Sequence, residues 1–72
     1  MDRNFHADLQ RIRDNLILMA EKSMQNTKMA VESLVKSDLA AAKKVVESDK
    51  EIDDLELDID QTAIRYMALY QP

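Results

Sequence analysis

The fold of this chain is decided by the stretch Glu47-Ser48-Asp49-Lys50-Glu51-Ile52-Asp53-Asp54-Leu55-Glu56-Leu57-Asp58-Ile59-Asp60. It holds eight acidic residues and one basic residue, with apolar side chains spaced through it. At about 100° per residue, four carboxylates share a helical sector of roughly 60°: Asp49, Asp53, Glu56 and Asp60. A neighbouring sector, about 90° away, collects the apolar and aromatic side chains: Ile52, Leu55, Ile59, Ala63, Tyr66 and Tyr70. The stretch therefore predicts an amphipathic helix in which a row of carboxylates, the acidic ladder, runs beside a buried stripe.

The composition of the whole chain favours an all-helical fold. Its 72 residues include no Gly, and the one Pro is Pro72, so little is present to build tight turns or bend strands. A chain of this length forms one domain at most and buries only about 60% of its unfolded surface. We therefore expect residues 1–72 to form a single helical-hairpin domain that gains stability from a partner.

Charge and residue usage exclude several classes of protein. The net charge is −4, and it is concentrated in residues 37–72, which carry nine acids and four bases. An acidic surface of this kind disfavours binding to a phosphate backbone, so no nucleic-acid partner is expected. The absence of Cys excludes disulfides and thiolate metal sites. No apolar run of about 20 residues and no signal-peptide pattern is present, which predicts a cytoplasmic protein.

Two helices of similar length are expected. The first begins behind Asp2 or Asn4 as N-cap and covers about residues 3–36, a tight turn follows near residues 36–38, and the second covers about residues 38–69. A stripe expected to face a partner helix steps along the first helix at spacings of mostly three and four: Phe5, Leu9, Ile12, Leu16, Met19, Ala20, Met24, Thr27, Val31 and Leu34. On the second helix the stripe also includes Ala41 and Val45.

Matched helices joined by a short turn predict an antiparallel hairpin. Ser48 and Glu51 have the spacing of a capping box, so a break near Glu47 is an alternative to one uninterrupted second helix, which we favour because the apolar register continues. Two rods leave apolar flanks exposed to water. The hairpin is therefore expected to complete a helical bundle by dimerisation, or to pack against further helices.

The acidic ladder admits a functional and a structural interpretation. Carboxylates at such spacings offer hard oxygen ligands to a divalent cation or to iron, provided that a second helix adds more ligands. The alternative is a solvated charged face beside the buried stripe, partly neutralised by Lys43, Lys44 and Lys50. Spacing alone favours the solvated face.

The remaining candidate residues point to packing. His6, the only histidine, has no ligand partner at suitable spacing and is assigned a surface or packing role. Tyr66 and Tyr70, one turn apart, are expected to pack together. Core-filling roles are expected for four methionines: Met19, Met24, Met29 and Met67. No phosphate loop, nucleophile with a His partner or zinc motif is present, so the chain is not expected to be an enzyme.

Residues 30–56 resemble the first part of a PhoU repeat. They read AVESLVKSDLAAAKKVVESDKEIDDLE and follow the pattern AL…D..LA..V...D..ID.LE. The ending Ala68-Leu69-Tyr70-Gln71-Pro72 is similar to the A.QQP that comes next in such repeats. This resemblance covers nearly the whole chain. It implies a PhoU-like, spectrin-like three-helix unit, of which this chain would hold the first two helices.

The resemblance also implies a function. PhoU-like proteins are cytosolic helical regulators that restrain phosphate-starvation signalling by contacting the phosphate ABC transporter and its sensor histidine kinase. Their E/D-x-x-x-D motif binds metal clusters, and Asp49-Lys50-Glu51-Ile52-Asp53 matches it. Asp49 and Asp53 thereby acquire a metal-ligand hypothesis, which Glu56 joins by helical geometry.

The chain departs from the family pattern by ending at Pro72, before the third helix with its second acidic motif. It is accordingly interpreted as a fragment or a truncated repeat, in which self-association replaces the missing helix. The alternative function is a structural helical oligomerisation module that has no role in phosphate signalling.

Overall fold

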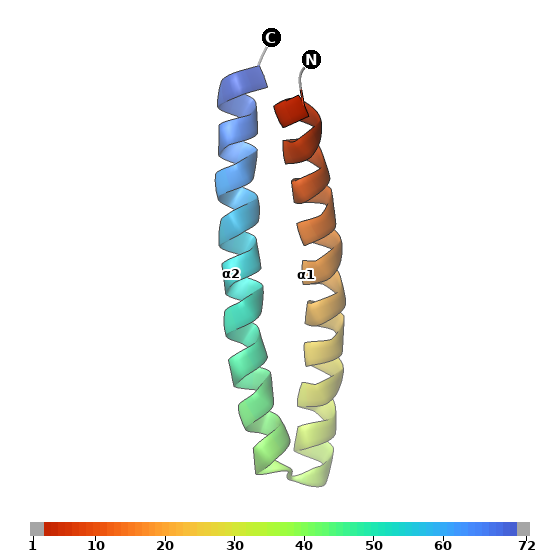
Figure 1. The fold of residues 1–72 in the computed structure, drawn as a ribbon. Coiled ribbons are helices and arrows are strands. Elements are labelled where there is room, and N and C mark those ends of the chain that lie inside the picture. Colours follow the sequence, from red (N-terminus) through yellow and green to blue (C-terminus); the bar gives the residue numbers. More distant parts are fainter. Residues whose placement is uncertain (1–2, 71–72) are drawn as a thin grey trace.

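In the computed structural model, residues 3–70 form two long helices, α1 (Arg3–Lys36) and α2 (Leu39–Tyr70). They lie antiparallel and side by side, with the start of α1 and the end of α2 together and the turn at the far end (Figure 1). The predicted all-α hairpin is confirmed. α2 runs without a break through Glu47, so the capping-box spacing of Ser48 and Glu51 does not end a helix here. The capping roles predicted for Asp2 and Asn4 concern side chains outside those that the structure describes.

The connection between the helices is a Schellman turn. Ser37 has a φ of 51°, the left-handed conformation, and its N–H donates to the Leu34 carbonyl at 3.3 Å. The N–H of Asp38 donates to the Ser33 carbonyl at 2.9 Å, which completes the motif. Asp38 then caps α2, because its Oδ1 accepts a hydrogen bond from the Ala41 N–H at 3.1 Å. The tight turn predicted near residues 36–38 is confirmed.

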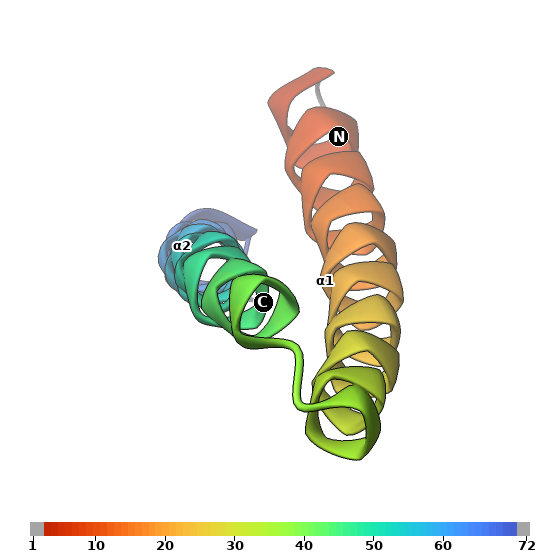
Figure 2. The same ribbon diagram turned by 90° about the horizontal axis from the view of Figure 1, so that it is seen from below.

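The molecule is a rod. Its principal extents are 52 × 16 × 14 Å and its radius of gyration is 16.3 Å, whereas a globular chain of this length has about 11 Å. Seen from the turn end, the two helices are inclined to each other, and no third element lies beside them among the described residues (Figure 2). Neither helix carries an apolar stretch within residues 3–70 that is long enough to cross a bilayer.

The helices meet along a seam of alternating three- and four-residue spacings, the heptad pattern of a coiled coil. The α1 side of this helix–helix seam is formed by Phe5, Asp8, Ile12, Asn15, Met19, Lys22, Asn26, Met29 and Ser33. The α2 side is formed by Ala41, Val45, Ser48, Ile52, Leu55, Ile59, Thr62 and Tyr66. All of these residues are buried or half-buried. More than half of the α1 members are polar, so the seam is not the apolar stripe that the pattern of α1 suggests.

The seam contains most of the stripe expected on α2, with the buried Thr62 in place of Ala63, and corrects the stripe expected on α1. Only Phe5, Ile12 and Met19 of the α1 stripe lie in the seam. The other members are exposed instead: Leu9, Leu16, Ala20, Met24, Thr27, Val31 and Leu34. These exposed residues form a second apolar stripe on α1 that is turned away from α2. The face of α1 that meets α2 is the one whose polar side chains pair with polar side chains of α2. The core roles predicted for Met24 and Met67 are wrong for the same reason, because both side chains are exposed.

No apolar side chain among the described residues is fully buried. The buried residues are polar: Asp8, Asn26, Ser33 and Thr62. Two rods in contact can cover only the narrow strip between them, and the apolar members of that strip keep one edge open to water. The expected exposure of apolar flanks is thereby confirmed.

Aromatic rings close the end of the hairpin opposite the turn. The Tyr66 and Tyr70 ring centroids lie 5.3 Å apart, which confirms the predicted packing pair. Phe5 of α1 stacks against both, at 5.3 Å and 5.1 Å. His6 makes an edge contact with Phe5 and is exposed, as its assigned surface or packing role requires. Offset and edge-on ring pairs of this kind stabilise a helix end beyond the area they bury.

Replacement of Ser37 by Gly tests the turn. A side chain in the left-handed conformation carries a steric penalty of about 1 kcal/mol that glycine lacks, partly offset by the greater freedom of glycine in the unfolded chain. We expect Ser37→Gly to raise the free energy of unfolding by about 0.5 kcal/mol, measured by urea denaturation followed by circular dichroism. Ser37→Ala is the control and should not stabilise the hairpin. A gain from Ala equal to that from Gly would contradict the role of the positive φ.

Candidate functional site

The acidic ladder lies along one flank of α2, and its members are all exposed. Asp49 lines a hollow of about 260 Å³ between the helices, whose α1 wall includes Ser23, Asn26 and Ala30. The next three carboxylates line a second hollow of about 260 Å³, which consists of Asp53, Glu56, Leu57 and Asp60. The structure thus brings Asp53 and Glu56 together and places Asp49 one turn away, facing α1.

The ladder has no ion pair among the side chains of residues 5–70. Among the side chains of residues 5–70, the ion pairs of α2 acids are those of Asp58 with Arg11 and of Glu51 with Lys22. The ladder residues belong to neither pair, so the neutralisation expected from Lys43, Lys44 and Lys50 does not occur through ion pairing. No three His, Asp or Glu side chains of the described chain converge closely enough to hold a metal ion. The donor chemistry suits a hard cation, but the number of ligands on this one helix is too small.

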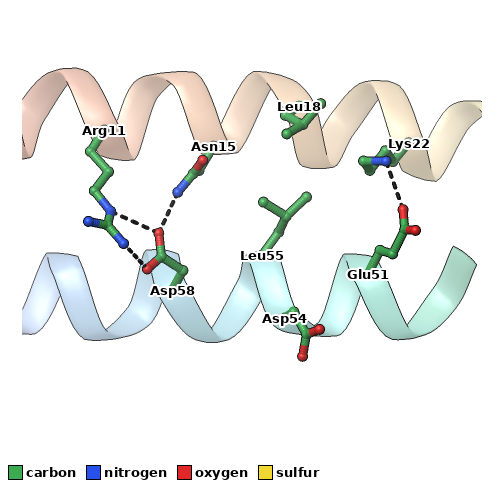
Figure 3. A pocket seen from close by; sticks show the side chains of 8 residues that line it. All are labelled: Arg11, Asn15, Leu18, Lys22, Glu51, Asp54, Leu55 and Asp58. Carbon is green, nitrogen blue, oxygen red and sulfur yellow. Dashed lines mark hydrogen bonds and ion pairs between the residues drawn. The ribbon is translucent and has the colours of Figure 1, made fainter.

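The opposite flank of the seam carries a network of polar contacts between the helices (Figure 3). The Arg11 guanidinium donates to both carboxylate oxygens of Asp58, with Nε 3.0 Å from Oδ2. The Asn15 amide donates to the same Oδ2. Two turns along, the Lys22 ammonium lies 2.8 Å from Oε2 of Glu51. These contacts tie α1 to α2 at two points separated by the apolar pair Leu18 and Leu55 (Figure 3).

Asp58 is the centre of this network. The hydrogen bond from the Arg11 guanidinium lowers the pKa of the Asp58 carboxyl below its ordinary value of 3.8, and the charge of Arg11 and the hydrogen bond from Asn15 act in the same direction. Desolvation opposes them without reversing the shift. The same hydrogen bond raises the pKa of Arg11 above its ordinary range. Both groups are therefore held in their charged forms.

A groove of about 490 Å³ lies over the network. Its walls carry the two ion pairs, the amide of Asn15 and the apolar side chains Leu18 and Leu55. Asp54 also lines it, and its carboxylate points away from α1 (Figure 3). The cations that line the groove are already paired with carboxylates, and no Ser, Cys or His lines it. The groove is therefore lined by the same polar contacts that join α1 to α2.

Two more polar contacts complete the ties across the seam. At the open end, the Arg65 guanidinium donates to Asp8 at 2.6 Å and 3.4 Å, and this raises the pKa of Arg65. Toward the turn, the Asn26 amide donates to the Val45 carbonyl at 3.1 Å. The Oδ1 atom of Asn26 is buried and has no hydrogen-bond partner in the described chain. A buried Asn at a core position of a coiled coil costs stability but fixes register, because any other alignment leaves it with fewer partners.

These polar ties are the part of the structure that the pattern of apolar residues missed. Asp8, Asn15 and Lys22 fall at alternating seam positions between Phe5, Ile12 and Met19. The heptad spacing of the seam was therefore present in the sequence of α1. It is not visible when only the apolar residues are considered, because every second member is polar.

The chain was compared with known proteins. The sequence model of the PhoU family, described as PhoU domain, matches residues 16–72. The phosphate-specific transport system accessory protein PhoU homolog of Aquifex aeolicus is 37% identical over 65 residues, which are 90% of this chain and 29% of that relative. The PhoU homolog of Pseudomonas putida is 31% identical over 72 residues, 100% of this chain and 28% of the relative. The accessory protein PhoU of Escherichia coli K12 is 32% identical over 68 residues, which are 94% of this chain and 28% of that relative.

The chain therefore spans less than a third of the length of these relatives. No solved structure matches it.

Asp58→Asn tests the network by removing the charge and keeping the size of the side chain. Because the pKa of folded Asp58 lies below 3.8, its carboxylate stabilises the hairpin at higher pH, and this contribution is lost as the pH falls through the lowered value. We expect the variant to melt at a lower temperature than the unsubstituted chain at pH 7. The difference should shrink as the pH falls below 3.8 and through the lowered pKa, where Asp58 of the unsubstituted chain becomes protonated as well.

Asp54→Asn is the matched control. It makes the same change one turn away, at a carboxylate that points away from α1 and has no ion pair among the side chains of residues 5–70. It should leave the melting temperature at pH 7 nearly unchanged. Equal losses in the two variants would show that the overall charge of α2, rather than the contact of Asp58 with Arg11, governs stability.

Proposed function

Because the chain belongs to the PhoU domain family, we propose that it is a regulator of phosphate transport and phosphate-starvation signalling that acts by protein–protein contact. The observation that carries this proposal is the match of the PhoU domain to residues 16–72. Relatives that share this segment are named accessory proteins of a phosphate-specific transport system.

The architecture is compatible with a contact-based role. Both helices expose large apolar side chains to solvent. Examples are Leu16 and Val31 of α1 and Leu57 and Ile64 of α2. A molecule with this surface gains free energy by burying it against another protein. We propose that the partners are the phosphate ABC transporter and its sensor histidine kinase, reached from the cytoplasm. In this role the chain is not an enzyme.

A helical oligomerisation module without a phosphate role is the second candidate. The unpartnered apolar surface favours it, since any assembly would cover that surface. The two candidates differ in their effect on gene expression. A phosphate regulator changes the transcription of phosphate-uptake genes, and an assembly module does not.

Removal of the gene segment that encodes residues 1–72 separates the two candidates. For a PhoU-type regulator, the loss relieves the restraint on the sensor kinase, so we expect phosphate-uptake genes to be expressed at high phosphate. Transcript levels or a promoter reporter in phosphate-replete medium provide the measurement. Re-expression of the segment from a plasmid is the control and should restore repression. Unchanged expression in the deletion strain would favour the assembly module.

We also propose that Asp49 and Asp53, joined by Glu56, contribute to a site for a divalent cation or iron. Carboxylates are among the ligands that such ions prefer, and hard cations take about six oxygen ligands in all, counting carbonyl groups and waters. The ladder has no ion pair with the side chains that the structure describes, residues 5–70, which leaves its oxygens available to a cation. We expect the site to be complete only when another helix supplies further carboxylates, and binding by the hairpin alone to be weak.

The double substitution Asp49→Asn with Asp53→Asn tests the metal site. We expect it to abolish metal uptake, measured by calorimetry and elemental analysis, and to leave helicity intact because both side chains are exposed. Glu47→Gln with Asp54→Asn is the control, with the same charge change on the other flank of α2, and should retain uptake. Uptake that survives the first pair of substitutions would show the ladder to be a solvated face.

A further inference from the structure

The flank of α1 that lies beside the acidic ladder carries no charge. Ser23, Thr27 and Ala30 line the hollow of about 260 Å³ that Asp49 also lines, so they lie on the same side of the hairpin as the ladder. Their spacing of three and four continues in both directions and gives a row of six residues, the uncharged flank: Leu16, Ala20, Ser23, Thr27, Ala30 and Leu34. Its two leucines have 45% and 80% of their surface accessible. This face of the hairpin therefore combines an uncharged edge from α1 with an acidic edge from α2.

The ion pairs across the seam set the two edges level with each other. They place residues 11–22 of α1 beside residues 51–58 of α2. Leu16 belongs to the first range, and Asp53 and Glu56 belong to the second. Axes of packed helices lie about 8–10 Å apart, so one further helix laid over the seam contacts both edges at once.

We propose that this face receives an amphipathic helix of a partner protein, whose apolar stripe packs on the uncharged flank and whose Lys and Arg residues pair with the ladder. Charge complementarity carries the proposal, because the ladder carboxylates are exposed and have no ion pair with the described side chains of residues 5–70. Amphipathic helices commonly dock in grooves through an apolar stripe with charges along its edge. The proposal rests on the contact-based role proposed above and adds the chemistry of the partner segment.

The hollow between the two edges supplies a second, independent observation. Asn26 lies in its wall with only 8% of its surface accessible, and the Oδ1 atom of Asn26 has no hydrogen-bond partner in the described chain. A buried acceptor without a partner costs free energy, which a donor from a ligand recovers. A Lys ammonium carries three donors and no acceptor. A Lys of the docked helix therefore suits both Asp49 and Asn26.

Other occupants fit this face less well. A second copy would present the same uncharged flank and the same ladder, neither of which supplies a cation to the carboxylates. Anionic membranes and nucleic acids carry negative charge, which the ladder repels. A helix with carboxylates of its own would also be repelled unless a cation lay between the two helices. A basic amphipathic helix supplies both the apolar and the charged complement.

A synthetic peptide provides the probe. It is a helix of about five turns, built of Ala and Leu, with a row of Lys at the spacing of the ladder along one edge of its Leu stripe. In the control peptide Glu replaces each Lys. We expect the 72-residue chain to bind the Lys peptide at least about tenfold more tightly than the Glu peptide, measured by fluorescence anisotropy at about 0.15 M salt.

Two matched pairs of variants locate the contact. Asp60→Lys changes a ladder carboxylate outside the proposed cation site and should weaken binding of the Lys peptide about tenfold, whereas Asp54→Lys on the other flank of α2 should weaken it less than about twofold. Leu16→Gln should weaken binding about fivefold through lost apolar burial, whereas Leu18→Gln should not. Both control positions line the groove on the opposite side of the seam (Figure 3). Circular dichroism verifies that each variant remains helical.

Equal affinity for the two peptides would overturn the inference. Equal weakening by Asp60→Lys and Asp54→Lys would also overturn it, as would binding that ignores Leu16→Gln. The transcription test of the proposed function is independent of these results. If deletion derepresses phosphate-uptake genes but the chain does not discriminate the peptides, the docking face is refuted and the regulatory role is retained. Discrimination without derepression would refute the phosphate role and retain the docking face.

Discussion

The hairpin depends on the polar ties between α1 and α2. Asp8 with Arg65, Arg11 with Asp58, Lys22 with Glu51 and Asn26 with the Val45 carbonyl follow one another from the open end toward the turn. A shift of one helix along the other would separate every donor from its acceptor at once. Since the seam has no fully buried apolar side chain among the described residues, apolar packing alone would tolerate such a shift. The ties therefore set the register, and the aromatic cluster and the Schellman turn hold the two ends.

A structure held together in this way keeps its apolar surface for other contacts. The face of α1 with the regular apolar stripe at residues 17–34 is turned away from α2, and the seam takes the polar face instead. A two-helix unit is well suited to assembly for this reason. Its internal contacts define the shape and alignment of the helices, while the free energy from apolar burial becomes available only when a partner arrives. Membership in the PhoU domain family, whose named relatives are accessory proteins, agrees with such a design.

The acidic ladder of α2, like the apolar stripe of α1, is left exposed for contacts outside the hairpin. Its four carboxylates are exposed and form no ion pair with the described side chains of residues 5–70. Four negative charges within three turns repel one another and destabilise an isolated helix slightly. A cation or a partner that neutralised them would relieve this repulsion. The ladder thus offers charge recognition on α2, beside the apolar surface of α1.

The sequence by itself determined the two helices, their lengths, the turn and the stripe on α2, because these depend on local signals. The lack of Gly, the capping Asp38 and the period of Ile52, Leu55 and Ile59 act within a few residues. The sequence also predicted the acidic ladder, since helical spacing alone places Asp53 and Glu56 side by side on α2. Only the tertiary structure decided which face of α1 meets α2. Two stripes with heptad spacing compete on that helix, and the choice rests on pairing between residues distant in sequence, such as Arg11 with Asp58 and Asp8 with Arg65. Those pairs form only when both helices are present, so no pattern within α1 reveals them.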